Sequence, residues 1–257
     1  MNIIDNNGLL TQQQIIDLQN EVTKPFRLAR FQSLDDILKE LNVDVIIEPG
    51  RPQSTMHFYL NEAKKFWEEK KREIREQLRD ENREAGRNLG NEVEEAQKNV
   101  RIIEEELDAW NSMLLLGLYV PSNNNIRLFP ENMAQEYGVS MMAELLLSTL
   151  AHETMHAYFD RPRHRSHPYV LFIEEPLAEF GMLLYLFDTN SSFYQWAYED
   201  VSSKRTCYRF GAMLMDQHLQ DNNNPSYNRA YLEKYKIRLD KYTMPDISWD
   251  RSSYKLP

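Results

Sequence analysis

Two histidines with a glutamate between them form the pattern in this sequence that could most readily carry chemistry. His152, Glu153 and His156 lie in the leucine-rich stretch "LLLSTLAHETMHAYFD" at residues 145–160. On a helix of about 100° per residue, His156 lies about 40° around from His152 and one turn along, so both imidazoles can reach one ion. Glu153 borders that face, where a carboxylate can act as a base towards metal-bound water. The alternative is a pair of boundary histidines on an amphipathic helix, each paired with a neighbouring carboxylate.

A catalytic zinc ion needs a third protein ligand and an open position for water. Glu175 follows His156 with the spacing HExxH-x18-E, and it begins a predicted helix over "EEPLAEFGMLLYLF". Glu179 lies one turn farther along the same face, where a carboxylate can bind a ligand histidine and fix its tautomer. Two glutamates on a solvated helix face are the simpler alternative. The coincidence with the histidine spacing counts against that alternative.

The loop that joins the two predicted helices is basic. The segment "DRPRHRSHP" at 160–168 contains Arg163, His164 and His167. These side chains could recognise an acidic side chain or the C-terminal carboxylate of a substrate. A solvated loop that balances an acidic protein is the alternative. Either histidine could also replace Glu175 as third metal ligand, although so short a loop favours the helix-borne carboxylate.

These motifs resemble those of the gluzincins, and specifically the aminopeptidase N-like branch. The signature of that branch is HExxH-x18-E, with the second glutamate opening an "NEGxA" helix. In "EEPLA", Glu175 takes the ligand position and Pro176 replaces the usual glycine. The branch also carries a tyrosine in a Tyr-x-x-Gly helix start, and "YRFGAMLM" offers Tyr208 and Gly211, closer to the glutamate than in the large enzymes. The resemblance covers roughly residues 113–220.

The resemblance implies zinc-dependent hydrolysis of peptide bonds. The Zn2+ ligands would be His152, His156 and Glu175. Glu153 would take a proton from the zinc-activated water and later deliver one to the leaving amine. Tyr208 would stabilise the tetrahedral oxyanion. The Gly-x-Met-Glu-Asn motif that recognises a free amino terminus is absent upstream, which favours an endopeptidase over an aminopeptidase.

A second tyrosine is a candidate for the oxyanion role. Tyr198 lies in the aromatic-rich segment 193–198, between the predicted glutamate helix and Tyr208. A place in the core or in a pocket wall is the alternative for this side chain.

The elements that would position these residues predict an α+β fold that is mostly helical. The segment "LLLGLYV-PSNNN-IRLF" at 114–129 predicts a strand hairpin, because β-branched and aromatic residues flank a Pro/Ser/Asn turn. A helix over 139–159 follows and carries the histidines. We therefore expect a zincin-like metallopeptidase domain over 113–257, with a small β-sheet, a histidine helix and a glutamate helix.

The first part of the chain, residues 1–112, is predicted to be a helical region. Thr11 and Ser33 are expected N-caps, and "VDVIIEP" at 43–49 predicts a short strand. A charge-rich amphipathic stretch at 61–110, interrupted by two glycines, predicts a long helical hairpin. Its mixed charges indicate a solvated face or a surface for a protein partner.

The composition of the 257-residue chain limits the classes of function. A formal net charge of −10 disfavours general binding to nucleic acid or to an anionic membrane, because like charges repel. With one cysteine, the chain would hold a metal through histidine and carboxylate ligands. The sequence has no apolar run of about 18 residues, and its N-terminus lacks the basic and apolar regions of a secretory signal. We therefore expect a cytoplasmic protein.

Three functions agree with these features. The first is a zinc endopeptidase that acts on peptide or protein substrates. The second is a dedicated regulatory peptidase that resembles the ImmA/IrrE group, with the helices at 61–110 recognising its partner. The third is a non-catalytic binding protein on a zincin scaffold. The intact Glu153 counts against the third function, because degenerate zincins often lose that base.

Overall fold

The computed structural model describes five continuous stretches of the chain and a few single positions. The stretches are residues 1–26, 32–50, 113–159, 174–204 and 208–220; the single positions are 68, 69, 72, 75, 76, 79, 101 and 108, all helical and exposed. The rest of the hairpin predicted at 61–110 lies outside the described residues. So does the basic loop at 160–168, with Arg163, His164 and His167.

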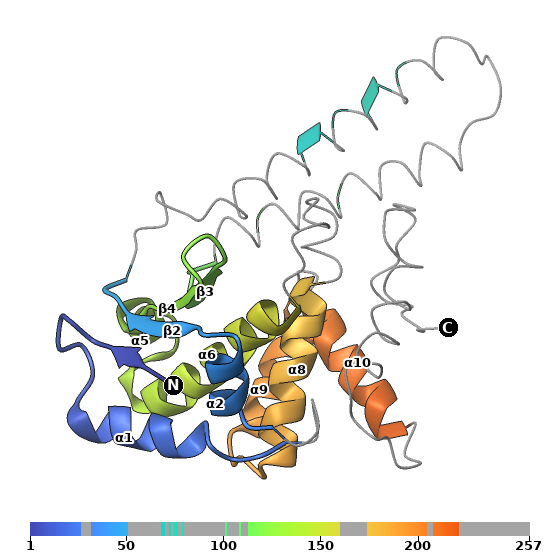
Figure 1. Cartoon of the computed structure of the whole chain (residues 1–257). Helices are drawn as coiled ribbons and strands as arrows, with labels where there is room; N and C mark the ends of the chain where they lie inside the picture. Colours follow the sequence, from blue (N-terminus) through green and yellow to red (C-terminus); the bar gives the residue numbers. More distant parts are fainter. Residues whose placement is uncertain are drawn as a thin grey trace.

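Four strands form one mixed sheet in the described part of the chain. The sheet has the order β1-β2-β4-β3, in which β1 pairs with β2 and β2 with β4 in parallel, while β3 pairs antiparallel with β4 (Figure 1). Strand β3 therefore lies at one edge. The bounds are β1 (Ile3–Ile4), β2 (Asp44–Ile47), β3 (Gly117–Val120) and β4 (Asn125–Leu128).

The strand hairpin predicted at 114–129 is confirmed as β3 and β4. The two strands are joined by the turn at 121–124, in which Asn124 adopts a positive φ of 50°. Asparagine tolerates that left-handed conformation better than most residues. The Asn124 amide also donates hydrogen bonds to the carbonyl oxygens of Leu41 and Asn42, at 2.9 and 2.8 Å. The turn is thereby tied to the residues just before β2.

Two short N-terminal helices begin at the caps that the sequence predicts. Thr11 and Ser33 each form a capping box, in which the side chain accepts from the backbone of the third helical residue and that residue's side chain bonds back. The helices are α1 (Gln12–Glu21) and α2 (Leu34–Glu40). Strand β1 was not predicted, because a two-residue strand leaves no periodic pattern in the sequence.

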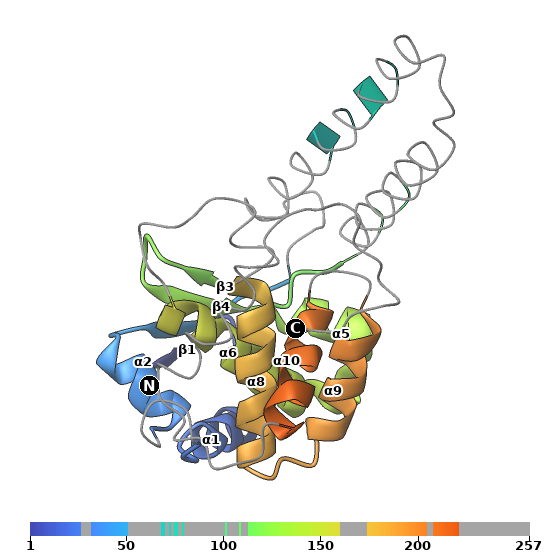
Figure 2. The ribbon, with the colours of Figure 1, turned by 90° about the vertical axis from the view of Figure 1, so that its right-hand side faces the viewer.

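Among the described helices after the sheet, α6 (Met142–Phe159) and α8 (Glu175–Asp188) have most of their residues buried. Helix α6 contacts β3 and β4 and also α8, while α8, α9 and α10 pack side by side (Figure 2). Gly181 makes the close approach of α8 to α6 possible, because a Cβ there would lie 2.4 Å from Cγ of Met155. The bounds are α5 (Pro130–Tyr137), η3 (Val139–Met141), α6 (Met142–Phe159), α8 (Glu175–Asp188), α9 (Tyr194–Ser203) and α10 (Arg209–Gln220).

The N-terminal elements share their core with the later helices. Val45 of β2, Leu38 of α2 and Leu150 of α6 belong to one cluster of buried apolar side chains. The boundary predicted at residue 112 thus separates two segments whose described parts pack together. The architecture is α+β and mostly helical with a small mixed sheet. Within the described residues, no helix has the length and apolarity needed to cross a bilayer.

Candidate metal centre

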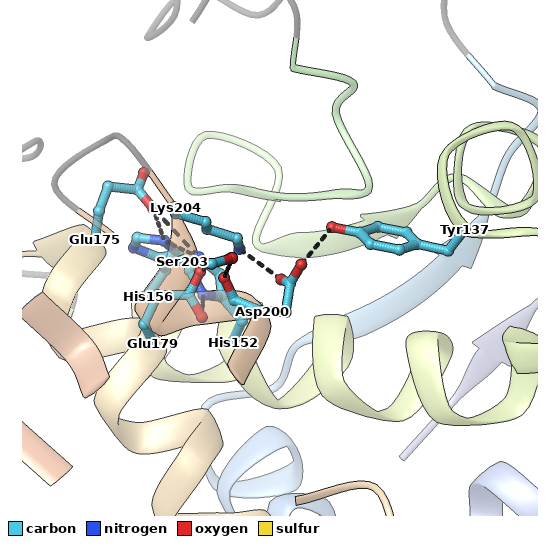
Figure 3. Close-up of polar contacts among 8 residues, drawn as sticks. All are labelled: Tyr137, His152, His156, Glu175, Glu179, Asp200, Ser203 and Lys204. Atoms are coloured by element: carbon cyan, nitrogen blue, oxygen red, sulfur yellow. Dashed lines mark hydrogen bonds and ion pairs between the residues drawn. The ribbon is translucent and has the colours of Figure 1, made fainter. Parts of the chain in front are cut away.

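Helix α6 carries both histidines on one face, near its C-terminal end. The helix is held in place by buried leucines before them, and His152 and His156 lie one turn apart. Their Nε2 atoms are 3.0 Å from each other, and their ring centroids are 4.8 Å apart (Figure 3). The two imidazoles therefore present the same type of ligand atom to one point.

The third side chain of the cluster comes from the first turn of α8. Glu175 Oε2 lies 3.3 Å from Nε2 of His152 and 3.3 Å from Nε2 of His156. This oxygen is buried and has no hydrogen bond within the described part of the chain. Pro176 occupies the first turn, where its missing N–H leaves no unpaired donor.

The spacing of these three atoms fits a metal ion. Around a tetrahedral zinc with ligand distances of about 2.0–2.1 Å, neighbouring ligand atoms lie about 3.3–3.4 Å apart. The observed separations are 3.0, 3.3 and 3.3 Å. Two imidazole nitrogens and one carboxylate oxygen are also the donor set of a known class of catalytic zinc site. His152, His156 and Glu175 can therefore hold a metal, and the buried Glu175 oxygen without a hydrogen bond is suited to face one.

The charges around the cluster shift its pKa values strongly. Burial opposes the charged form of His152, but the carboxylates of Glu179 and Glu175 outweigh it and raise the pKa of His152 to about 10. Glu175 likewise raises the pKa of His156 against the effect of burial. Burial alone would raise the pKa of the Glu175 carboxyl, yet the two histidines hold it well below its ordinary value. The site thus favours positive charge between its ligand atoms.

Glu179 lies behind the histidines, one turn after Glu175. Its Oε2 is 3.7 Å from Nδ1 of His152, an ion-pair distance, while its Oε1 accepts a hydrogen bond from Lys204 Nζ at 3.0 Å (Figure 3). Burial favours the neutral acid, but Lys204 and His152 lower the pKa of Glu179 to about 2. The ionised Glu179 carboxylate therefore faces Nδ1 of His152, the ring nitrogen that points away from the candidate metal position. This contact favours the tautomer that carries its proton on Nδ1 and leaves Nε2 free to bind a metal.

Glu153 is placed between the histidine helix and the edge strand. Its Oε2 accepts a 2.7 Å hydrogen bond from the backbone N–H of Tyr119 in β3. Gly117 permits this close approach, because a Cβ there would lie 2.4 Å from Cγ2 of Thr149 and 3.0 Å from Cγ of Glu153. Burial raises the pKa of the Glu153 carboxyl, and the opposing effect of the neighbouring His152 and His156 does not cancel this rise.

The two candidate oxyanion tyrosines differ in their surroundings. The ring of Tyr208 packs edge-on to His152, with centroids 6.0 Å apart, and Lys204 Nζ lies 5.0 Å from its centroid. The hydroxyl of Tyr198 instead donates a 2.7 Å hydrogen bond to Asp216 of α10. Tyr208 is therefore the tyrosine that packs against the histidine cluster, and the hydroxyl of Tyr198 is engaged elsewhere.

Three further residues near the cluster were not identified from the sequence: Tyr119, Asp200 and Lys204. Lys204 Nζ lies 3.5 Å from Asp200 Oδ2, and Asp200 Oδ1 accepts a 3.4 Å hydrogen bond from the Tyr137 hydroxyl (Figure 3). The local signal is an Asp and a Lys four residues apart, which is common on any exposed helix. The link from Lys204 to Glu179 depends on the packing of α9 against α8.

No known protein family, curated protein or solved structure matches this chain significantly. We therefore assign the site from its own geometry.

Proposed function

We propose that this chain is a zinc-dependent peptidase of the endopeptidase type, with a zincin-like core. The observation that carries the proposal is the triangle formed by Nε2 of His152, Nε2 of His156 and Oε2 of Glu175, with sides of 3.0–3.3 Å. The HExxH-x18-E spacing brings those atoms together from two helices, and Glu153 lies beside them. A structural ion pair accounts for the two 3.3 Å contacts of Glu175 Oε2, whereas a ligand set also accounts for the two Nε2 atoms that face each other beside it at 3.0 Å.

When bound, Zn2+ supplies a Lewis acid that polarises a carbonyl and lowers the pKa of a coordinated water towards neutrality. Glu153 is the base of the proposal. Its Oε2 is held by the Tyr119 N–H, which leaves Oε1 to take the proton of the attacking water and to return a proton to the leaving amine. The raised pKa of Glu153 suits a group that must both accept and release a proton.

The edge strand suits an extended substrate. Strand β3 has β4 as its partner on one side in the described sheet, and it lies against the helix that carries the histidines. A peptide that adds to such an edge gains main-chain hydrogen bonds and is aligned with the strand. We propose that a peptide lies along β3, with its scissile bond near Glu153. Tyr208, beside His152, is the proposed oxyanion donor.

A peptide-library digest tests this function. Zinc-loaded protein should cleave unstructured peptides at internal bonds, and the Glu153→Gln variant in the same assay should not. Cleavage of many sequences supports a general endopeptidase. Stoichiometric zinc without cleavage of any library peptide supports instead a dedicated peptidase with one protein target. A protein that binds no zinc contradicts both.

A further inference from the structure

A lysine takes part in the polar contacts that extend from the candidate metal centre. Lys204 is the C-cap residue of α9, and its side chain is about one quarter exposed. It donates a hydrogen bond to Glu179 Oε1 at 3.0 Å and lies 3.5 Å from Asp200 Oδ2. The same ammonium group lies over the ring of Tyr208, 5.0 Å from its centroid.

We propose that Lys204 is a positioning residue for the metal centre, acting through Glu179 on His152. The inference rests on the proposed zinc site. Lys204 binds one oxygen of the Glu179 carboxylate, and the other oxygen faces Nδ1 of His152 at 3.7 Å. Rotation of the carboxylate would break the first contact, so the lysine keeps the second oxygen directed at the imidazole. His152 is thereby held with Nε2 towards Glu175 and His156.

The burial of Glu179 makes this contact different from a surface ion pair. The side chain of Glu179 is 5% exposed, and a buried carboxylate is costly unless a charged partner and hydrogen bonds compensate it. The pair of Lys24 and Glu21 has a shorter separation of 2.6 Å, but its side chains are 45% and 37% exposed. Such exposed pairs contribute little. Lys24 therefore provides a matched control for the removal of a paired lysine.

A purely electrostatic role of Lys204 and a positioning role predict opposite changes in zinc affinity when the lysine is removed. A cation close to a metal ion repels it, so removal of the ammonium group would strengthen zinc binding if the charge acted only through space. A positioning role predicts that zinc binding weakens. The direction of the change thus separates the two roles without any measurement of catalysis.

The experiment is a titration of metal-free protein with zinc in competition with a chromophoric chelator. Partners behind a metal ligand typically contribute about 10–100-fold to metal affinity, and we expect Lys204→Met to weaken zinc binding by about 10-fold. Lys204→Arg, which keeps a cationic donor, should stay within about 3-fold of the parent, and Lys24→Met should bind as the parent does. The double variant Glu179→Gln/Lys204→Met should bind no more weakly than Glu179→Gln, because Lys204 acts through Glu179.

Each outcome decides the inference. Weaker binding by Lys204→Met together with non-additivity in the double variant supports it. Unchanged or tighter binding, or additive losses in the double variant, overturns it while leaving the zinc site intact. If the parent chain itself binds no zinc, the proposed function fails as well. Lys204→Gln serves as the second variant if Lys204→Met does not give the circular dichroism spectrum of the folded parent.

Discussion

The backbone N–H of Tyr119 donates a 2.7 Å hydrogen bond to the carboxylate of Glu153, across 34 positions of the sequence. This bond joins the edge strand of the sheet to the helix that carries the two histidines. A peptide aligned along β3 would therefore lie beside the residue proposed as the base.

Replacement of the proposed base should separate metal binding from hydrolysis. Glu153→Gln keeps the shape and an acceptor oxygen for the Tyr119 N–H, but it cannot take a proton. We expect bound zinc to be retained and kcat to fall by about 10²–10⁴-fold, the usual contribution of a general base. Glu144→Gln, the same change in the first turn of α6, should alter neither property. A Glu153→Gln protein with full activity would rule out this role for Glu153.

Removal of the Tyr208 hydroxyl should affect the transition state more than substrate binding. We expect Tyr208→Phe to lower kcat by roughly 10²–10³-fold with little change in KM, which is the range for the loss of one oxyanion donor. Tyr198→Phe is the comparison, because its hydroxyl bonds to Asp216. Steady-state kinetics on a cleaved library peptide measures both variants. A large loss in Tyr198→Phe alone would transfer the role to Tyr198.

Gly211 should be intolerant of a side chain for a steric reason. A Cβ at this position of α10 would lie 2.3 Å from Cβ of Glu179 and 2.9 Å from the backbone nitrogen of Phe180, so α8 would have to move. We expect Gly211→Ala to lower the free energy of unfolding by about 1–3 kcal/mol, as overpacking does. Chemical denaturation measures this, with the exposed Gln220→Ala as control at less than about 0.5 kcal/mol. Equal midpoints for parent and Gly211→Ala would contradict the observed packing.

The raised pKa of His152 predicts that the stability of the metal-free protein and its affinity for zinc change in opposite directions with pH. A folded pKa of about 10, above the ordinary 6.5, means that the fold stabilises the imidazolium. This contribution to stability is fully present below pH 6.5 and is lost as the pH rises through about 10. Zinc needs the neutral imidazole, so zinc binding must release the proton, and the apparent affinity should rise by about tenfold per pH unit for each proton released.

Thermal unfolding of metal-free protein and chelator competition, both between pH 6 and 9, measure these two dependences. A zinc affinity that does not change over this range would contradict a protonated metal-free site. Asp44→Asn, which changes an exposed carboxylate of β2, is a control that should leave both pH dependences unchanged.

Local features of the structure could be predicted from the sequence, and long-range contacts could not. The caps at Thr11 and Ser33 and the 114–129 hairpin depend on neighbouring residues, and the structure contains all three. The histidine spacing is a property of one helix, so their convergence was also predictable. The role of Glu175 as third ligand was predicted from the resemblance to the HExxH-x18-E signature, because the geometry of one helix does not place a residue of another.

The contacts that complete the site have no local pattern. Lys204 meets Glu179 across 25 positions and Tyr119 meets Glu153 across 34, so both depend on how helices and strands pack in three dimensions. Helices α5 and α9 were not predicted, because each is ten residues or shorter and so short a stretch shows only weak hydrophobic periodicity. The close approaches between elements at Gly117, Gly181 and Gly211 likewise exist only in the folded chain.

The zinc content of protein purified without added zinc tests the metal site most directly. We expect about one zinc per chain in the parent protein, because His152, His156 and Glu175 can supply the three protein ligands of a catalytic zinc site. His156→Ala should lose that zinc while keeping the circular dichroism spectrum of the metal-free parent. A folded His156→Ala protein that retains one zinc per chain, or a parent protein without affinity for zinc, would contradict the assignment of the site.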